Sequence, residues 1–407
     1  MSIIPIISAS YGLPYEFIYA VLILLSIPFI KSSLSIESTT IIGLTKKAYL
    51  LLVLFIFLGL RGFLQTDFLA YHKYFQDVPT IWENTSITDY IFTGKYKDWE
   101  KGFLIFSIFS KSILPNYFFL QALSFLVDFI LIYYFFDYYV REYLFLSFAF
   151  FFVFSGLEIE INLLRNSKSI CLFLFSIRYL DKKNYAIYFL INTIGFFFHS
   201  SALVYLFFGF FLRLKFSRKL IITIIFTGIV FFIFRISIIS IILSFLGDIV
   251  PGRLGLLIRY YLESNKSTVG LSIGFIERLF TAILLLCFYR FMYENTRKRI
   301  IGNALAIYLC TYFYGFEVPI VYQRLGALFV FSYWIFYPLI YQRLSKEKKI
   351  LFMAVFTFYA LLKIYSGFKY SLFYYDNLLS LNMLDYEQRK NIVFYYKQFE
   401  AQMGWSR

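Results

Sequence analysis

The chain has 407 residues, of which 60% are hydrophobic and 24% aromatic, and it carries a formal net charge of +15. In a soluble protein this charge would suggest a nucleic-acid partner. Here Lys and Arg gather in short loops between apolar runs, so we predict a membrane protein with no nucleic-acid partner. The recurring runs predict an all-α, polytopic transmembrane helical bundle of about 10–12 spans, forming one membrane domain over residues 1–407.

Apolar runs and loop charges together predict a topology. The expected spans, in chain order, are 15–30, 47–60, 116–136, 143–157, 162–178, 219–240, 271–290, 301–316, 324–342 and 350–366. Short basic loops favour the cytoplasmic side, and five are found, at residues 31–47, 178–183, 213–219, 290–299 and 343–349. Three extracytoplasmic elements follow: loop 61–115, in which 102–114 forms a surface helix, loop 247–270 and the tail 367–407.

Residues 184–212 lie between two of these basic loops, so the chain must enter the membrane and return. At about 1.5 Å per helical residue, this stretch is too short for two passes of about 30 Å. We therefore expect two short helices that meet near His199. Broken helices at membrane depth are tolerated where they line a cavity.

Charged side chains beside apolar sequence are costly and mark candidate functional sites. Arg61 and Asp67 follow the second span, and Tyr71 stands one helical turn later. The alternative for Arg61 and Asp67 is a simple ion pair at the membrane edge. Glu100 stands where the long loop re-enters apolar sequence, and its alternative role is to stabilise a helix N-terminus.

Arg165 and Lys168 are three residues apart, so we expect them to share one helix face. Two cations on one face suit a diphosphate or carboxylate ligand, and the planar guanidinium of Arg is the better phosphate binder. The alternative is a salt bridge from Arg165 to Glu158 or Glu160. Further candidates for phosphate or sugar contacts are Arg259 and Tyr260 in loop 247–270, and Arg324 at the start of a late span.

His199 and Ser200 lie at the expected helix break. A histidine that lines a cavity there is a candidate base, proton shuttle or hydrogen-bond donor. The alternative is a histidine buried in the core with its hydrogen bonds satisfied. The sequence contains no Walker A loop, paired CxxC, HExxH or GxSxG motif. ATP hydrolysis, zinc peptidase and serine hydrolase chemistry therefore find no support.

Taken together, these positions resemble the EpsG-like family of Wzy-type polysaccharide polymerases, which are bacterial membrane glycosyltransferases. The resemblance spans residues 50–380. It is carried by Arg61-Gly62, Asp67, Tyr71, Glu100-x-Gly102-Phe103, Arg165 and Phe198-His199-Ser200-Ser201-Ala202, with weaker echoes at Arg324 and in Tyr374-Tyr375-Asp376-Asn377. The late segment departs most from the family pattern, because a Pro-Tyr pair is expected where Tyr374-Tyr375 stands.

The resemblance implies a GT-C-like membrane glycosyltransferase that joins undecaprenyl-diphosphate-linked oligosaccharides into O-antigen, capsule or exopolysaccharide. The site would face the exterior of the bacterial plasma membrane, and membrane lipid and a chain-length regulator would be partners. We expect no cofactor and no obligate metal, because cations can stabilise the leaving diphosphate. The expected catalytic residues are Asp67, Glu100, Arg165 and His199, with Asp67 or His199 as base. The expected substrate contacts are Arg61, Tyr71, Lys168, Ser200, Arg259, Tyr260 and Arg324.

Three alternatives remain open. A lipid-linked oligosaccharide flippase would place cations along a central path, and inverted repeats would favour transport, but no such repeat is evident. An O-antigen ligase is a related glycosyltransferase for which a different set of motifs is expected. A membrane acyltransferase using His199 would leave the Arg residues unexplained.

Overall fold

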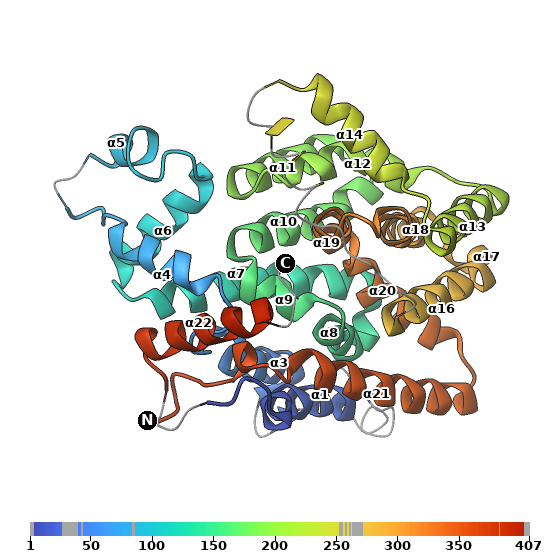
Figure 1. The fold of residues 1–407 in the computed structure, drawn as a ribbon. Coiled ribbons are helices and arrows are strands. Elements are labelled where there is room, and N and C mark those ends of the chain that lie inside the picture. Colours follow the sequence, from blue (N-terminus) through green and yellow to red (C-terminus); the bar gives the residue numbers. More distant parts are fainter. Residues whose placement is uncertain are drawn as a thin grey trace. The chain divides into compact units, whose positions relative to one another are not determined.

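The computed structural model shows an all-α protein, which confirms the fold class expected from the sequence (Figure 1). It describes residues 4–26, 40–41, 44–83, 86–251, 255–256, 259, 262, 272–381 and 383–402. Two short strands, β1 Thr40–Ile41 and β2 Leu44–Thr45, pair antiparallel. The membrane part is built from two compact units, residues 1–206 with 341–406 and residues 207–340 with 407. Each unit is described by itself.

The first unit is a helical bundle. Its helices include α1 Leu13–Ser26, α3 Lys46–Leu54, α7 Tyr117–Val140, α8 Leu144–Val153, α9 Gly156–Asn162, α10 Leu164–Asp181 and α21 Lys346–Phe368. A π-helical turn, Phe55–Gly59, continues α3 and brings the chain to Arg61. Helix α10 packs against α7, and α1 packs against α8 and α21. Every residue of α8 except Phe145 is buried, as expected for a helix that is apolar on all sides.

Two short helices occupy the stretch between the basic loops around residues 178–183 and 213–219. Helix α11 Tyr185–Phe198 packs on α10, and α12 Ala202–Arg213 continues from the first unit into the second. His199 ends α11 with an extended backbone, at φ −163° and ψ 137°. The break predicted near His199 is therefore confirmed, and residues 199–201 connect the two helices.

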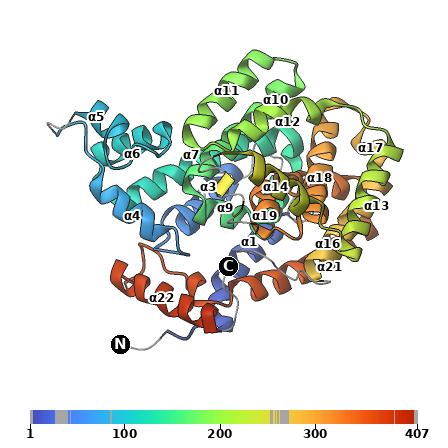
Figure 2. The ribbon, with the colours of Figure 1, turned by 45° about the horizontal axis from the view of Figure 1, so that its top comes forward.

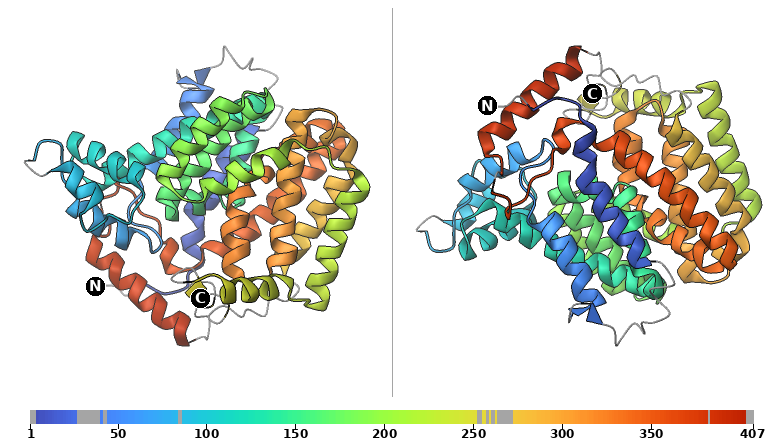
Figure 3. Two further views of the ribbon diagram at one scale, coloured as in Figure 1. Left: turned by 90° about the horizontal axis from the view of Figure 1, so that it is seen from above. Right: turned by 90° about the horizontal axis from the view of Figure 1, so that it is seen from below.

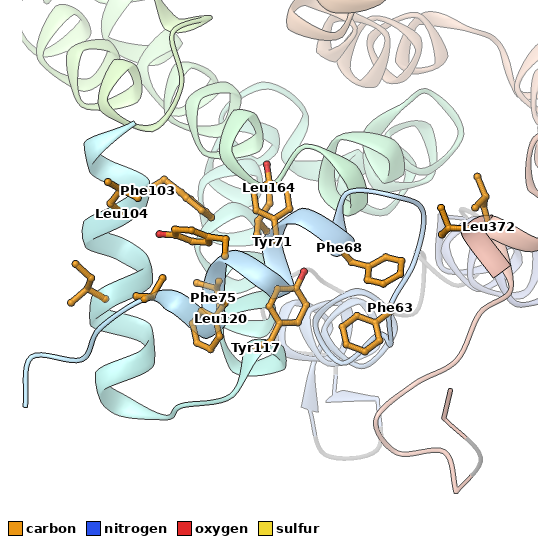
Figure 4. Close-up of a cluster of buried hydrophobic side chains, with 14 of the residues drawn as sticks. Phe63, Phe68, Tyr71, Phe75, Phe103, Leu104, Tyr117, Leu120, Leu164 and Leu372 are labelled. Atoms are coloured by element: carbon orange, nitrogen blue, oxygen red, sulfur yellow. The ribbon is translucent and has the colours of Figure 1, made fainter. Parts of the chain in front are cut away.

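The long loop after Arg61 folds into three helices, α4 Phe68–Asp77, α5 Ile87–Phe92 and α6 Lys101–Ile113 (Figure 2). An aromatic cluster forms where α4 and α6 meet the start of α7, and in Figure 4 Tyr71 and Phe75 lie between Phe103 and Tyr117. Ring contacts of this kind are each worth about 0.5–1.5 kcal/mol beyond the area that they bury. They give the loop helices a packed core that they share with the start of α7.

The C-terminal helix α22, Tyr386–Gln402, closes over this aromatic cluster. Val393 and Tyr396 are buried in it, and Leu372 joins it from the short 3₁₀ turn Ser371–Phe373. Within the predicted tail 367–407, residues 386–402 form a helix that packs on the loop.

In the second unit most helices run alongside one another, whereas α14 Ile238–Ile249 turns away from α13 Arg218–Phe234 by 87° (Figure 3). Its helices include α13 Arg218–Phe234, α14 Ile238–Ile249, α16 Ile273–Cys287, α17 Tyr289–Met292, α18 Thr296–Gly315, α19 Pro319–Phe329 and α20 Phe331–Arg343, the last of which ends in the first unit. Helix α18 is central, because α13, α16 and α19 all pack against it.

Three helical stretches among the described residues are long and apolar enough to cross a membrane: Ala9–Ser26, Tyr117–Val153 and Lys346–Phe368. The number rises to five if each of two bent pairs is one span: Arg218–Phe234 with Ile238–Ile249, and Tyr322–Phe329 with Phe331–Arg343. Helices occupy the other expected spans too, and one of them, Ala48–Gly59, is short. The protein is an integral membrane protein whose helices follow the apolar runs of its sequence.

Candidate active site

Arg165, on the first turn of α10, is the centre of a polar cluster in the first unit. Its Nη1 donates to Glu100 Oε2 over 2.6 Å, and its Nε donates to the Tyr71 hydroxyl over 3.3 Å. The guanidinium also lies over the Trp99 ring, 4.5 Å from the ring centre. The side chains of Arg165 and Glu100 are 27% and 20% exposed. The ion pair is therefore held firmly and can still be reached from outside.

Glu100 is placed by the start of α6. Its backbone carbonyl accepts the amides of Phe103 and Leu104, while its carboxylate turns to Arg165. Gly102 packs directly on the end of α11, where an added Cβ would lie 2.8 Å from the Phe197 carbonyl oxygen. The Glu100-x-Gly102 spacing thus has a physical reason: glycine lets the two helices touch, and Glu100 then reaches Arg165.

Asp67 and Tyr71 lie one turn apart at the start of α4. The Asp67 carbonyl accepts the Tyr71 amide over 3.1 Å, and the Asp67 side chain is half-buried. Burial raises the pKa of Tyr71, and the charge of Arg165 acts in the opposite direction. Tyr71 therefore stays a neutral hydroxyl beside the guanidinium, and Asp67 lies one helical turn before Tyr71 in the chain.

His199 joins the same region through its neighbours. Its Nδ1 lies 2.9 Å from Ser201 Oγ, which in turn donates to Asn166 Oδ1 over 2.5 Å. Asn166 directly follows Arg165 on α10. The structure therefore brings Tyr71, Glu100, Arg165 and His199 together around one helix start. Ser200 is exposed at the break, and the hydroxyl that contacts the imidazole belongs to Ser201.

Arg61, predicted as a substrate contact, is a buried side chain in the structure. The side chain is 2% exposed. Its guanidinium donates to the backbone carbonyls of Leu58 and Glu160, the latter over 3.0 Å. It thereby caps the π-helical turn after α3 and ties it to α9, because the carbonyls at a helix end lack partners within the helix.

Gly62 explains the rest of the Arg61-Gly62 motif. Its amide donates to the Asp376 carbonyl over 2.9 Å, and an added Cβ would lie 1.9 Å from the Asp376 carboxylate. That carboxylate pairs with Arg389 of α22 over 2.8 Å, and both side chains are buried. The late Tyr375-Asp376-Asn377 segment therefore packs on the Arg61-Gly62 motif.

Lys168 also differs from its predicted role. It is 2% exposed, donates to the Ser124 carbonyl over 3.1 Å and pairs with Asp128 of α7, which is wholly buried. The expected face shared with Arg165 is split by tertiary packing: Arg165 turns to α4 and α6, and Lys168 turns to α7. Sequence reasoning missed Asp128, although a carboxylate within the apolar run Phe125–Ile132 is a recognisable signal.

His72 is surrounded by aromatic rings. It stacks on Tyr386 with ring centres 4.5 Å apart and meets the edge of Phe63 at 5.3 Å. Burial lowers the pKa of His72, which favours the neutral ring. Its surroundings are those of a packing residue.

The remaining predicted contacts belong to the second unit. Arg259 donates to the Gly247 carbonyl and pairs with Asp248, and Arg324 is exposed on α19. Tyr260 lies outside the described residues.

Arg278 is a further charged residue within an apolar run, and the sequence analysis did not identify it as a candidate. Arg278 of α16 donates to the Tyr308 hydroxyl over 3.1 Å and lies 4.1 Å from the centre of the Tyr312 ring. Its neighbour Glu277 is 4.0 Å away. Charged residues within an apolar run are the signal that would have drawn attention to this pair.

Comparison with known proteins adds a family to this geometry. The model of the EpsG family matches residues 46–383, a range that holds the whole Arg165 cluster and the late segment packed on Arg61-Gly62. No curated protein and no solved structure matches the chain. Because the family match covers most of the sequence, the chain belongs to the EpsG family.

Proposed function

We propose that this protein is a polysaccharide polymerase that joins oligosaccharide repeat units carried on undecaprenyl diphosphate. The growing glycan is the donor, and a single repeat unit on the same carrier is the acceptor. The product is an O-antigen, capsule or exopolysaccharide chain at the outer face of the bacterial plasma membrane. Family membership supports a polymerase-like role, and the Arg165 cluster supports the choice of donor.

The geometry of Arg165 is the observation that carries the proposal. Tyr71 and Glu100 occupy its Nε and Nη1, and within the described residues Nη2 makes no hydrogen bond. A guanidinium oriented in this way, and still partly exposed, can donate to diphosphate oxygens. Trp99 and Tyr71 pack beside the guanidinium and hold it in place.

The reaction balances without a co-reactant. The acceptor hydroxyl oxygen forms a bond to the anomeric carbon of the donor, and the bond from that carbon to the diphosphate oxygen breaks. A base takes the hydroxyl proton, and the polyprenyl diphosphate leaves with the bonding electron pair. Arg165 stabilises the charge that develops on the leaving oxygen, and a fixed hydrogen-bond donor to a developing oxyanion is worth about 3–4 kcal/mol.

Asp67 and His199 remain the candidate bases, and Glu100 orients Arg165. Both substrates carry long prenyl chains, so the site must open sideways to lipid. The Arg165 cluster lies at a helix start in a membrane protein, which is compatible with lipid-borne substrates.

The experiment is a ladder assay with matched arginine variants. The gene is deleted in its host and restored on a plasmid, and the surface glycan is separated on a gel. A ladder that collapses to one repeat unit without the gene and returns with it supports a polymerase. Repeat units stranded in the inner leaflet would instead indicate a flippase, and normal polymer that is not attached to its final acceptor would indicate a ligase.

Arg165→Ala is expected to abolish chain growth while the protein remains inserted and abundant. Arg178→Ala is the matched control, because Arg178 lies on the same helix but packs on Phe175 near its other end. Near-normal ladders from Arg165→Ala would refute the diphosphate role. Equal losses from both variants would point to damage to α10.

A further inference from the structure

We propose that Asn166 and Ser201 hold the imidazole of His199 with its proton on Nδ1, so that Nε2 is the base that accepts the acceptor hydroxyl proton. The inference rests on the proposed polymerase function for the identity of that hydroxyl. The hydrogen-bonded chain itself stands on geometry alone: His199 Nδ1, Ser201 Oγ and Asn166 Oδ1 follow one another at 2.9 and 2.5 Å.

The first step is to locate the hydroxyl proton of Ser201. Its oxygen lies 2.5 Å from the side-chain oxygen of Asn166. The atom of Asn166 that faces Ser201 is the side-chain oxygen, which accepts a hydrogen bond and cannot donate one, so the hydroxyl proton of Ser201 lies between the two oxygens.

The second step follows for the imidazole. Because the Ser201 hydroxyl donates its only hydrogen to Asn166, its oxygen presents only lone pairs to His199 Nδ1, which is 2.9 Å away. A bare Nδ1 would bring two lone pairs together, whereas an Nδ1–H would donate a good hydrogen bond. A neutral imidazole carries one N–H, so its other nitrogen, Nε2, is left as the acceptor.

One contact works against this arrangement. The backbone amide of Ser201 lies 3.2 Å from the same Nδ1 and would favour the opposite tautomer, with the proton on Nε2. The two hydrogen bonds through the Ser201 hydroxyl, at 2.9 and 2.5 Å, are both shorter than this amide contact. Hydrogen bonds that form a chain also strengthen each other. The choice between a base and a donor at Nε2 therefore depends on Ser201 and Asn166, which are positioning residues.

The fold gives the chain of bonds a rigid support. Asn166 is buried on the first turn of α10, directly after Arg165. One helix start therefore positions the cation proposed for the leaving diphosphate and orients the ring proposed to take the proton. A well-placed general base contributes about 10²–10⁴-fold to the rate, and a ring held in the wrong tautomer loses that contribution.

The tautomer can be measured without turnover. The chain has only two histidines, so ¹⁵N-histidine labelling of the protein in lipid nanodiscs and a His72→Phe variant assign each ring by NMR. We expect the neutral His199 ring to carry its proton on Nδ1 in the wild type and on Nε2 in Ser201→Ala. A wild-type ring protonated on Nε2 would overturn the proposal. Because no substrate is present, this result is independent of whether the protein polymerises glycans.

Rates in proteoliposomes with lipid-linked repeat units test the functional consequence. Ser201→Ala and Asn166→Ala should each lower kcat by 10-fold or more with little change in KM, whereas Ser201→Thr and Asn166→Asp keep the acceptors and should retain most of the rate. Thr193→Ala, on the exposed side of α11, is the matched hydroxyl-deletion control.

His199 itself separates base from donor. A glutamine side chain places an amide donor near the position of Nε2 but supplies no base, so His199→Gln should be as impaired as His199→Ala. Activity retained by His199→Gln, or by Ser201→Ala, would refute the base assignment. If the wild-type protein forms no polymer in this assay but carries its proton on Nδ1 in the NMR experiment, the proposed function is refuted. The hydrogen-bonded chain from Asn166 through Ser201 to His199 would then still stand.

Discussion

Replacing Gly102 by alanine is the sharpest test of how the site is assembled. The added Cβ would lie 2.8 Å from the carbonyl oxygen of Phe197 and 2.9 Å from its carbonyl carbon. Both are backbone atoms at the end of α11, so no flexible side chain can move away. To restore an ordinary contact, α6 must retreat from α11 by about 0.6 Å. Glu100, two residues earlier, moves with α6 and away from Arg165.

The cost is expected to appear in the reaction rather than in folding. Overpacking of this kind costs about 1–3 kcal/mol, but alanine in a helix recovers about 1 kcal/mol relative to glycine. The net loss of stability is therefore small. A displacement of about 1 Å at catalytic groups can lower a rate by about 10²-fold, so we expect Gly102→Ala to lower chain growth by 10-fold to 100-fold.

Gly195→Ala provides a matched control on the partner helix. A Cβ at Gly195 would meet Ala202 and Ser169 at 3.6 and 3.7 Å, which are ordinary contacts. Both variants gain helix propensity, and only one disturbs the approach of α6 to α11. The assay is the initial rate of polymer formation in proteoliposomes, with thermal unfolding of each purified variant alongside. Equal rates for the two variants would refute the argument that close packing at Gly102 aligns Glu100 with Arg165.

The remaining predictions concern buried charges. Lys168→Met leaves Asp128 buried without its partner and should lower the free energy of unfolding by about 3–5 kcal/mol, whereas adding Asp128→Leu should recover most of the loss. Denaturant unfolding in detergent measures both variants. If the losses of the two single variants simply add up in the double variant, the pairing is contradicted. Arg389→Leu should likewise expose α22 to limited proteolysis, because it strands the buried Asp376 carboxylate, while an unchanged cleavage pattern would show that α22 is held by its aromatic contacts alone. His72→Phe should retain near-normal chain growth, since its ring packs among other rings, and a loss comparable to that of His199→Ala would show a role that its surroundings do not suggest.

Local sequence patterns predicted the parts of the site that depend on local geometry. The length of residues 184–212 was enough to expect a break near His199, because the distance available to two helices is fixed by rise per residue. The same reasoning did not identify the buried partners of Arg61 and Lys168. Whether a cation faces substrate or a buried partner is decided by residues far along the chain, here Glu160 for Arg61 and Asp128 for Lys168. Spacing along one helix carries no information on such partners.

The start of α10 shows why spacing alone misled. Successive residues of an α-helix point about 100° apart, so Arg165, Asn166 and Lys168 are directed to different neighbours. Arg165 reaches Glu100, Asn166 reaches Ser201 beside His199, and Lys168 reaches Asp128. A rotation of α10 would break all three contacts together. The buried pair of Lys168 and Asp128 therefore acts on the chemistry indirectly, because it fixes the rotation at which Arg165 and Asn166 meet their partners. If that is so, the Lys168→Met, Asp128→Leu double variant, restored in stability but released from the ion pair, should still show a lower rate of chain growth than the wild type. A double variant with the full wild-type rate would show that apolar packing alone sets the rotation of the helix.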